Sequence, residues 1–439
     1  MTTENKGGAL SWYFRVNLLT RIMIGLILGV VVGSILAAAA SEETVKAFVT
    51  YTKFFGDIFI RLLKMIVVPV IFLSLVTGAA SIEPSKLGRV GLKTLVFYIA
   101  TSVVAVAIGL IMANILHPGL GLNVVVNAEA AGKAASETPL AQILLSIVPT
   151  NPVESLAKGD VLPIIFFALV FGISLALVRE SSNQDAAKWA DSLFHLFSAG
   201  AETMYKVVAG IMHYAPVGVF VLIAIVFAQQ GLQAVTTLLY VTLTVYIGLA
   251  LHVLITYGGL MKIFGLSFKK YVQGTYEASV TAFVTRSSSG TLPVTLRVSE
   301  EKLGVPRSIS SFTLPVGATV NMDGTAIYLA VCAMFIGFAT GQPLDTGQQM
   351  TVIITATLAA IGTAGVPGAG AIMLLMVLES VGLNVTEGSS VAAAYAMILG
   401  IDALLDMGRT SINVTGDVAG AVIISKNEKA LDMSKWQKS

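Results

Sequence analysis

Long apolar segments recur along the first two thirds of the chain, separated by short polar connections. Each segment can hold the ~20 residues that a helix needs to cross a bilayer, although one is interrupted by prolines. The composition agrees, because 12% of the residues are charged, whereas soluble domains have roughly 25%. The sequence therefore predicts an all-α polytopic membrane protein. The segments cover about 17–40, 47–80, 91–116, 139–178, 192–228 and 234–265.

Three bulk properties exclude other classes of protein. The formal net charge is +2 and no basic stripe exists, which argues against a nucleic-acid surface. The N-terminal stretch is too polar for a secretory signal peptide and lacks a small-residue cleavage site. The single cysteine, Cys332, excludes internal disulfides, and its apolar neighbours favour a packing role.

The distribution of lysine and arginine predicts the orientation of the chain in the membrane. These residues gather at the N-terminus, in the 83–93 connection, after residue 260 and in the C-terminal tail. The 41–46 and 128–138 connections carry one lysine each, beside glutamates. Because positively charged loops stay on the cytoplasmic side, we expect both termini in the cytoplasm and a multi-pass protein of the cell membrane.

The last third of the chain is organised differently. In the stretch 347–383, two apolar runs of about a dozen residues flank the Gly/Pro cluster GTAGVPGAG. Neither run can span a bilayer at ~1.5 Å per residue, so the two are expected to form a re-entrant hairpin. Residues 267–300 repeat this pattern with the tip TRSSSGTLP, and a helix with central polar residues follows each hairpin. Repeated broken helices are typical of secondary transporters; the alternative is two ordinary kinked helix pairs.

The apolar run near 391–424 contains the polar stretch ILGIDALLDMGRTSINVTGD. Five polar side chains recur there at intervals of 4, 3, 4 and 4 residues, which places them on one face of a helix. An unpaired charge at membrane depth costs at least ~2.5 kcal/mol, so this face must meet protein, water, ions or a substrate. The alternative is a purely structural ladder of ion pairs. The five residues are Asp402, Asp406, Arg409, Asn413 and Asp417.

Arg409 and Asp406 together predict a site for a charged amino acid. A guanidinium matches the two oxygens of a carboxylate, and an aspartate one turn away offers a partner for an amino group. Free aspartate and glutamate carry both groups. We expect Asp406 to meet the α-amino group and Arg409 to meet the side-chain carboxylate.

A second polar cluster, NMDGT at 321–325, lies in the middle of another apolar run. Asparagine, aspartate and glycine have poor helix propensity, so we expect a local unwinding there. Unwound carbonyls and the carboxylates of Asp323 and Asp417 would supply hard oxygen ligands for a small cation such as Na⁺. The alternative is a kink lined by a buried water. The serine-rich tip RSSSGT is a weaker signal, for anion binding at a helix N-terminus.

Other functional classes fit these residues less well. A serine hydrolase would need a GxSxG elbow or a histidine near the serines, and the sequence has neither. An intramembrane aspartyl enzyme would need a GxGD pattern, which is absent. Its aspartates would also have to take up a proton, whereas Arg409 nearby would hold carboxylates ionised. His117, His195, His213 and His252 show no metal-ligand spacing. A channel needs a continuous polar path, whereas these polar residues cluster at one depth. We therefore expect no enzyme and no cofactor.

The four motifs resemble those of the glutamate/aspartate:cation symporter family, which includes the excitatory amino-acid transporters. SSSGTLP, NMDGT, GTAGVPGAG and DMGRTSINVTGD are specific in combination, and the similarity covers nearly the whole chain. It is closest to the archaeal sodium-coupled aspartate transporters. The resemblance implies symport of L-aspartate, with glutamate as a further candidate, together with sodium ions. The implied partners are membrane lipid and two further copies in a homotrimer, and not nucleic acid.

The resemblance also implies an architecture. Family members are bowl-shaped homotrimers whose protomers have eight transmembrane helices and two oppositely oriented re-entrant hairpins, arranged as inverted repeats. A scaffold holds the trimer, while a transport domain slides across the membrane like an elevator. The implied scaffold covers 10–84 and 118–231, the transport domain covers 85–117 and 232–426, and a cytoplasmic tail covers 427–439.

The functional positions of the family map onto this chain residue by residue. Substrate contacts are implied for Ser288, Thr325, Val366, Gly370, Asp406, Arg409, Thr410 and Asn413, with Val366 and Gly370 acting through their backbone. One sodium ion is implied at Asp417 with carbonyls of Gly317, Asn321 and Asn413. A second is implied at carbonyls of Thr319, Ile361 and Thr363, and a third at Tyr98, Thr101, Ser102, Asn321 and Asp323.

Two positions depart from the pattern of many relatives. Leu329 stands where proton-coupled, potassium-exchanging relatives have a glutamate, and leucine cannot carry a proton. Sodium is therefore the expected coupling ion. Arg286 precedes the tip serines, whereas many relatives place that arginine at Met407, and we expect it to stabilise the tip against Asp402 or the membrane surface. A C4-dicarboxylate carrier, a proton-coupled glutamate symporter and, in a different class, an anion channel are the alternatives.

Overall fold

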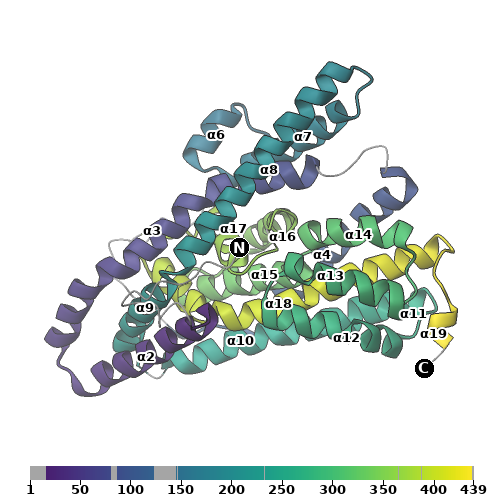
Figure 1. Cartoon of the computed structure of the whole chain (residues 1–439). Helices are drawn as coiled ribbons and strands as arrows, with labels where there is room; N and C mark the ends of the chain where they lie inside the picture. Colours follow the sequence, from purple (N-terminus) through teal and green to yellow (C-terminus); the bar gives the residue numbers. More distant parts are fainter. Residues whose placement is uncertain are drawn as a thin grey trace.

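The described part of the chain is entirely helical in the computed structural model (Figure 1). Six of its helices are long and apolar enough to cross a membrane, and one bent helix pair would make a seventh. This confirms a polytopic membrane protein. The N-terminal lysine and arginine at positions 6 and 15 and the 128–138 connection lie outside the described residues. The structure describes residues 16–80, 87–122, 145, 147–231, 233–363, 365–386 and 388–437.

Helices from the first half of the chain pack against one another. These are α2 (Leu18–Ala39), α3 (Glu42–Ala80), α6 (Pro152–Lys158), α7 (Val161–Arg179), α8 (Gln184–Met212) and α9 (Ala215–Gln230). Glycines let α2 approach α9 closely, because a Cβ at Gly25, Gly29 or Gly33 would lie 2.4, 2.8 or 2.5 Å from a carbonyl oxygen of α9. Small residues spaced by four positions are typical of helix contacts in membranes.

The apolar segment expected at 192–228 is divided between two helices. α8 ends at Met212, α9 begins at Ala215, and their axes differ by 51°. Pro216 lies in the first turn of α9, where a proline that lacks an N–H starts a helix but does not continue one. The bend therefore follows from the Ala-Pro step, which hydropathy alone does not reveal.

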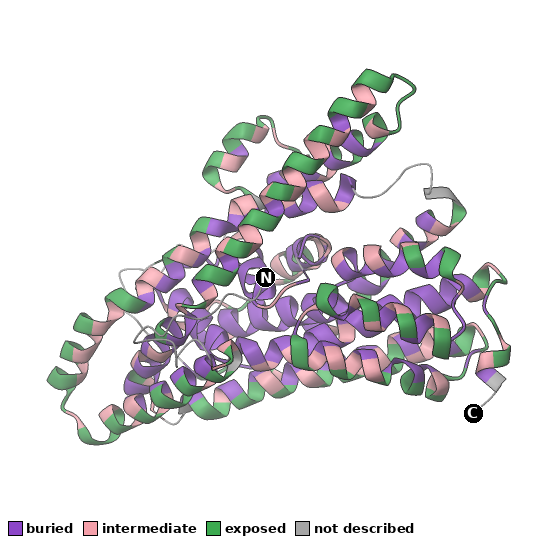
Figure 2. Cartoon of the chain, in the orientation of Figure 1, coloured by how far each residue is buried: buried purple, intermediate pink, exposed green. Residues whose placement is uncertain are grey.

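Helices from the second half of the chain gather around α18 (Ser390–Asn427), which is buried along almost all of its length. Figure 2 shows this concentration of buried residues around α18 and the more exposed outer helices. Contacts with α18 come from α10, α12, α14 and α15. η2 (Leu87–Gly91) and α4 (Leu92–Leu116) come from the first half of the chain but pack with this group. Its remaining elements are α10 (Gln233–Leu251), η4 (His252–Tyr257), α11 (Gly258–Ile263), η5 (Val298–Lys302) and α19 (Ser434–Gln437).

Both expected hairpins are present as pairs of short helices that pack against each other. The first consists of α12 (Phe268–Thr285) and α13 (Ser288–Arg297), and the second of α16 (Thr346–Ile361) and α17 (Ala369–Ser380). Their tips touch, because Ser287 Oγ donates to the carbonyl of Gly365 at 2.8 Å. A Cβ at Gly365 would lie 2.6 Å from Ser289 Oγ, so this close approach requires glycine.

The expected unwinding at NMDGT is confirmed. α14 (Arg307–Val320) ends just before the motif and α15 (Asp323–Ala339) begins within it. Between them, Asn321 is extended with φ −96° and ψ 93°, and Met322 has φ −121° and ψ 51°. The break places the N-terminus of α15 and the carbonyl end of α14 beside the middle of α18.

Candidate functional site

A small cavity lies between the two hairpin tips, the break after α14 and the middle of α18. Its volume is about 10 Å³, roughly the room of one water molecule. All eight residues expected to contact substrate line this cavity. They are Ser288, Thr325, Val366, Gly370, Asp406, Arg409, Thr410 and Asn413.

Arg409 is the centre of the charged part of this cavity. Its Nη1 donates to Asp402 Oδ1 at 2.9 Å and its Nε donates to Asp406 Oδ1 at 3.1 Å. The guanidinium also lies over the ring of Tyr328, with Cζ 4.3 Å from the ring centroid. Arg409 follows Asp406 by three residues and Asp402 by seven, which puts all three charges on one face of α18. The ion pairs expected of a purely structural ladder are therefore present in this conformation.

Arg286 differs from the expectation. It lies at the tip of the first hairpin with φ +55°, where its backbone N–H caps α12 by donating to Ala282. Its Nη1 is 3.9 Å from Asp406 Oδ2, whereas Asp402 pairs with Arg409. The expected contact with Asp402 or the membrane surface is therefore wrong. Because Arg286 is buried, it is part of the charged site itself.

Two glycines allow backbone to approach Arg409. A Cβ at Gly370, at the N-terminus of α17, would lie 2.5 Å from Arg409 Cζ. A Cβ at Gly324, in the first turn of α15, would lie 2.2 Å from the Arg409 carbonyl oxygen. The second hairpin can thus close on the Arg409 guanidinium, and the broken helix on the Arg409 backbone, only because these positions lack side chains.

Asn413 joins α18 to the start of α15. Its side-chain oxygen accepts hydrogen bonds from the backbone N–H groups of Gly324 at 2.8 Å and Thr325 at 3.3 Å. Its amide nitrogen donates to Thr325 Oγ1 at 3.2 Å. These bonds satisfy N–H groups that a helix leaves free at its N-terminus, and they fix Thr325 at the cavity wall.

A second cluster, centred on two carboxylates, lies one to two turns further along α18. Asp417 Oδ1 accepts a hydrogen bond from Asn321 Nδ2 at 3.0 Å. Asp323 Oδ1 accepts from Ser102 Oγ at 2.8 Å and from Thr101 Oγ1 at 3.3 Å. Asp323 is fully buried and Asp417 is 2% exposed, and neither pairs with a lysine or arginine among the described residues.

Most of the expected cation ligands surround these carboxylates. A Cβ at Gly317 would lie 2.5 Å from Asp417 Oδ1 and 2.8 Å from the Tyr98 hydroxyl. This glycine therefore leaves room for both groups. Asn321 bridges the cluster, since its Oδ1 accepts from Thr101 at 3.4 Å while its Nδ2 donates to Asp417. Hydroxyl, amide and carboxylate oxygens of this kind suit a hard cation.

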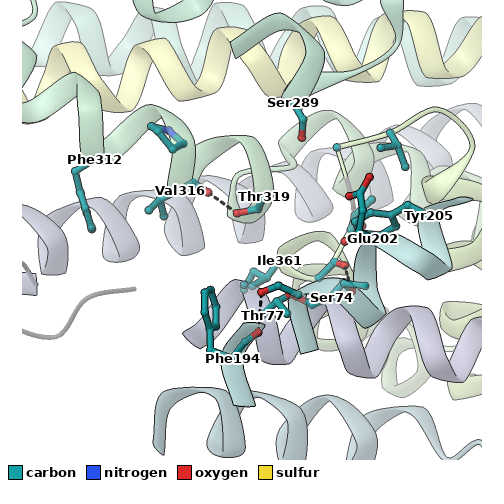
Figure 3. A pocket seen from close by; sticks show the side chains of 18 of the residues that line it. Ser74, Thr77, Phe194, Glu202, Tyr205, Ser289, Phe312, Val316, Thr319 and Ile361 are labelled. Carbon is teal, nitrogen blue, oxygen red and sulfur yellow. Dashed lines mark hydrogen bonds between the residues drawn. The ribbon is translucent and has the colours of Figure 1, made fainter. Parts of the chain in front are cut away.

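The expected ligands of the second sodium ion lie apart from that cluster. Thr319, Ile361 and Thr363 line a larger cavity of about 1140 Å³ between the two groups of helices. Figure 3 shows residues of α14 on one side of it and residues of α3 and α8 on the other. Ser74 of α3 crosses to the second hairpin, where its Oγ donates to the carbonyl of Gly362 at 2.9 Å.

Two residues of the carboxylate cluster were missed by sequence reasoning. His252 Nε2 lies 3.1 Å from Asp323 Oδ2, and the Tyr257 hydroxyl donates to the same oxygen at 2.8 Å. Both are fully buried in η4. The available signal was a histidine inside the apolar segment 234–265, because polar side chains at membrane depth need a partner.

Comparison with known proteins identifies the family. Residues 18–427 match the sodium:dicarboxylate symporter family. The chain is 35% identical to the proton/sodium-glutamate symport protein of Geobacillus stearothermophilus, over 94% of this chain and 95% of that protein. It is also 35% identical to the proton/glutamate-aspartate symporter of Escherichia coli strain K12, over 94% of both.

A third relative widens the range of substrates in the family. The C4-dicarboxylate transport protein of Rhizobium johnstonii is 34% identical over 88% of this chain and 86% of its own length. All three relatives are transporters, and together with the apolar helices they make this chain an integral membrane transporter and not an enzyme. The chain belongs to the sodium:dicarboxylate symporter family.

Proposed function

We propose that the protein takes up L-aspartate, and glutamate as a second substrate, by symport with sodium ions. One observation carries the cation dependence. Asp323 and Asp417 are buried, and their hydrogen-bond donors are hydroxyl, amide and imidazole groups without a fixed positive charge. Two buried carboxylates without such a partner are costly, so a bound cation stabilises the domain.

Substrate selection rests on the first cluster. Arg286 and Arg409 face Asp402 and Asp406, so two positive charges balance two negative ones. A substrate carboxylate that binds Arg409 replaces one aspartate partner, and a substrate ammonium satisfies the aspartate that is released. A ligand with both groups therefore exchanges charge pairs without leaving a buried charge unpaired.

Access to this site requires the second hairpin to move. The cavity of about 10 Å³ is too small for an amino acid, and its roof is formed by Val366 and Gly370. Opening of this hairpin admits the substrate, and closure over it brings the carbonyls of Ile361 and Thr363 back beside Thr319. Substrate binding and completion of the second sodium site then occur in one step.

The coupling between sodium and substrate follows from the negative charge of the buried carboxylates. Sodium at Asp323 and Asp417 neutralises the carboxylates and orders the NMDGT backbone, to which Asn413 and Thr325 of the substrate site are attached. By reciprocal linkage, sodium and substrate raise each other's affinity. In this proposal, a homotrimeric scaffold holds transport domains that cross the membrane as elevators only when the carboxylates are neutralised and the hairpin is closed. Both termini lie in the cytoplasm.

Proton coupling is the second candidate. A proton also neutralises a buried carboxylate, and the Geobacillus and Escherichia coli relatives are named as proton/sodium-glutamate and proton/glutamate-aspartate symporters. Two features favour sodium. The oxygen-rich set around Asp323 suits a hard cation, and Leu329, fully buried in α15, has no titratable group.

A charge-balanced variant tests the role of Arg409. Arg409→Gln alone leaves Asp402 without its cationic partner, while Arg286 still faces Asp406. Breaking a buried ion pair on one side in this way destabilises a fold by about 3–5 kcal/mol. We therefore combine Arg409→Gln with Asp402→Asn, which keeps the net charge unchanged, and use Asp402→Asn alone as the control. The double variant is expected to bind L-aspartate at least about 100-fold more weakly than the control, because a buried charged contact is lost.

The measurement is calorimetric titration of the purified protein at saturating sodium, with L-aspartate, L-glutamate, succinate and L-serine. Equal aspartate affinity in the double variant and its control would exclude Arg409 as the carboxylate receptor. Tighter binding of succinate than of aspartate by the unmodified protein would show instead that the site selects C4-dicarboxylates.

A further inference from the structure

The two oxygens of Asp323 face different groups. Oδ1 is bonded to Ser102 and Thr101, which belong to the proposed sodium site. Oδ2 is bonded to the Tyr257 hydroxyl and His252 Nε2 at 2.8 and 3.1 Å. The carboxylate therefore lies between a side that can receive an ion and a side that is held by a neighbouring helix.

The π-helical turn η4 makes the second side possible. His252 and Tyr257 are five residues apart, and an α-helix with ~3.6 residues per turn would separate them around its axis. Bonds from residue i to i+5 bring such a pair onto one face, and the N–H of Gly258 bonds to Val253 in this way. The two rings meet edge to face with centroids 4.8 Å apart, so both reach the same oxygen.

Thr256 is the hydrogen-bond partner of the second ring nitrogen of His252. An ionised carboxylate only accepts hydrogen bonds, so the imidazole must donate from Nε2 to Asp323. In the neutral ring Nδ1 is then an acceptor, and Thr256 Oγ1 lies 3.1 Å from it. The chain Thr256–His252–Asp323 thus engages both ring nitrogens and holds the ring in one orientation.

α18 leaves space for this arrangement. A Cβ at Gly416 would lie 2.4 Å from the Tyr257 hydroxyl and 2.6 Å from Asn321 Nδ2. The absence of a side chain there allows Tyr257 to approach Asp323 and Asn321 to approach Asp417. A glycine one residue before Asp417 therefore serves both carboxylates.

We propose that His252 and Tyr257 are positioning residues that orient Asp323 for sodium binding. This inference rests on the proposed function, in which sodium binds at Asp323. The two side chains act through the carboxylate: they fix Oδ2, and so direct Oδ1 toward Thr101, Ser102 and Asn321. Groups that hold a metal ligand in this way typically change metal affinity about 10–100-fold when they are removed.

Three variants and a matched control test the proposal. Tyr257→Phe and His252→Leu each remove one donor to Oδ2, while His252→Gln keeps an N–H near the position of Nε2. Tyr271→Phe is the control, since Tyr271 is also buried and packs edge to face against Tyr257 with centroids 6.4 Å apart. Its hydroxyl donates to the Thr415 carbonyl at 2.7 Å and not to Asp323.

The measurement is the sodium concentration that gives half-maximal L-aspartate binding to the purified protein, with the melting temperature recorded in parallel. Tyr257→Phe and His252→Leu are expected to raise that concentration about 10-fold, with unchanged aspartate affinity at saturating sodium. His252→Gln is expected to restore the sodium dependence. Tyr271→Phe should lower the melting temperature and leave the sodium dependence unchanged.

The outcomes separate the inference from the function on which it rests. An unchanged sodium dependence in Tyr257→Phe and His252→Leu, beside a sodium-dependent unmodified protein, overturns the positioning role alone. A His252→Gln protein that is as impaired as His252→Leu overturns it for His252. Aspartate binding by the unmodified protein without any sodium dependence overturns both the inference and the proposed function.

Discussion

At the scale of single residues, the two clusters along α18 differ in their charge. Arg286 and Arg409 compensate Asp402 and Asp406, whereas Asp323 and Asp417 pair with no lysine or arginine among the described residues. The first cluster can exchange its internal pairs for those of a zwitterion with an extra carboxylate. The second needs a positive charge from outside. In the proposed function, this separation lets one helix bind an anionic amino acid and cations together.

Gly370 offers a test of how closely the second hairpin closes on Arg409. The added Cβ of Gly370→Ala would lie 2.5 Å from Arg409 Cζ, so the guanidinium must move. We expect L-aspartate affinity to fall about 10-fold, in line with the cost of overpacking. Gly210→Ala is the control, because nothing lies within 4 Å of its added Cβ. Calorimetric affinities that are equal in both variants would contradict this close contact.

The sequence predicts residues within one helix better than contacts between helices. The spacing from Asp402 to Asp417 follows from helical periodicity, and these residues do lie on one face. Contacts between side chains of different elements cannot be predicted from helical periodicity. Arg286 reaches Asp406 across a hairpin tip, and His252 reaches Asp323 from a π-helical turn, and neither contact has a periodic signal.

At the scale of elements, the broken helices position both clusters. The NMDGT break and the two hairpins follow from Gly, Pro and Asn content, and they appear where the sequence places them. The bend between α8 and α9 and the π-helical turn at 252–257 were not expected. Each depends on a local backbone geometry that hydropathy does not encode.

In the proposed elevator mechanism, the hydrogen bond between α3 and the second hairpin is expected to break when the transport domain moves. Ser74 Oγ donates to the Gly362 carbonyl, so Ser74→Ala removes a buried hydrogen bond worth about 1 kcal/mol. If this step limits turnover, the maximal rate of uptake rises about fivefold at unchanged half-saturating aspartate. Thr77→Val is the control, because Thr77 lies on α3 near the same cavity but bonds only within its own helix. The comparison is made by initial-rate uptake into liposomes, and equal rates for the two variants would refute a barrier at this contact.

At the scale of the whole molecule, the chain forms two groups of helices with a cavity of about 1140 Å³ between them. The group from the first half carries exposed apolar side chains such as Leu177, Trp189 and Leu196, which lipid or other subunits must cover. The sequence predicts the membrane class and the number of apolar segments from composition. It does not reveal how the two groups are arranged, because hydropathy carries no information about which helices pack together.

Assembly is tested by native mass spectrometry of the protein released from detergent. One chain has a mass of 46.0 kDa, and the proposed homotrimer is expected at three times that mass. A scaffold that stays fixed while transport domains move needs such an anchor. A monomer mass under conditions that preserve aspartate binding would contradict the trimer.

The coupling ion is the central claim, and uptake of radiolabelled L-aspartate into liposomes that hold the purified protein tests it most directly. One set of liposomes has only an inward sodium gradient, and a second has only an inward proton gradient. The oxygen-lined cluster around Asp323 and Asp417 predicts accumulation under sodium alone and none under protons alone. Accumulation under the proton gradient in the complete absence of sodium would contradict the sodium assignment of these two carboxylates.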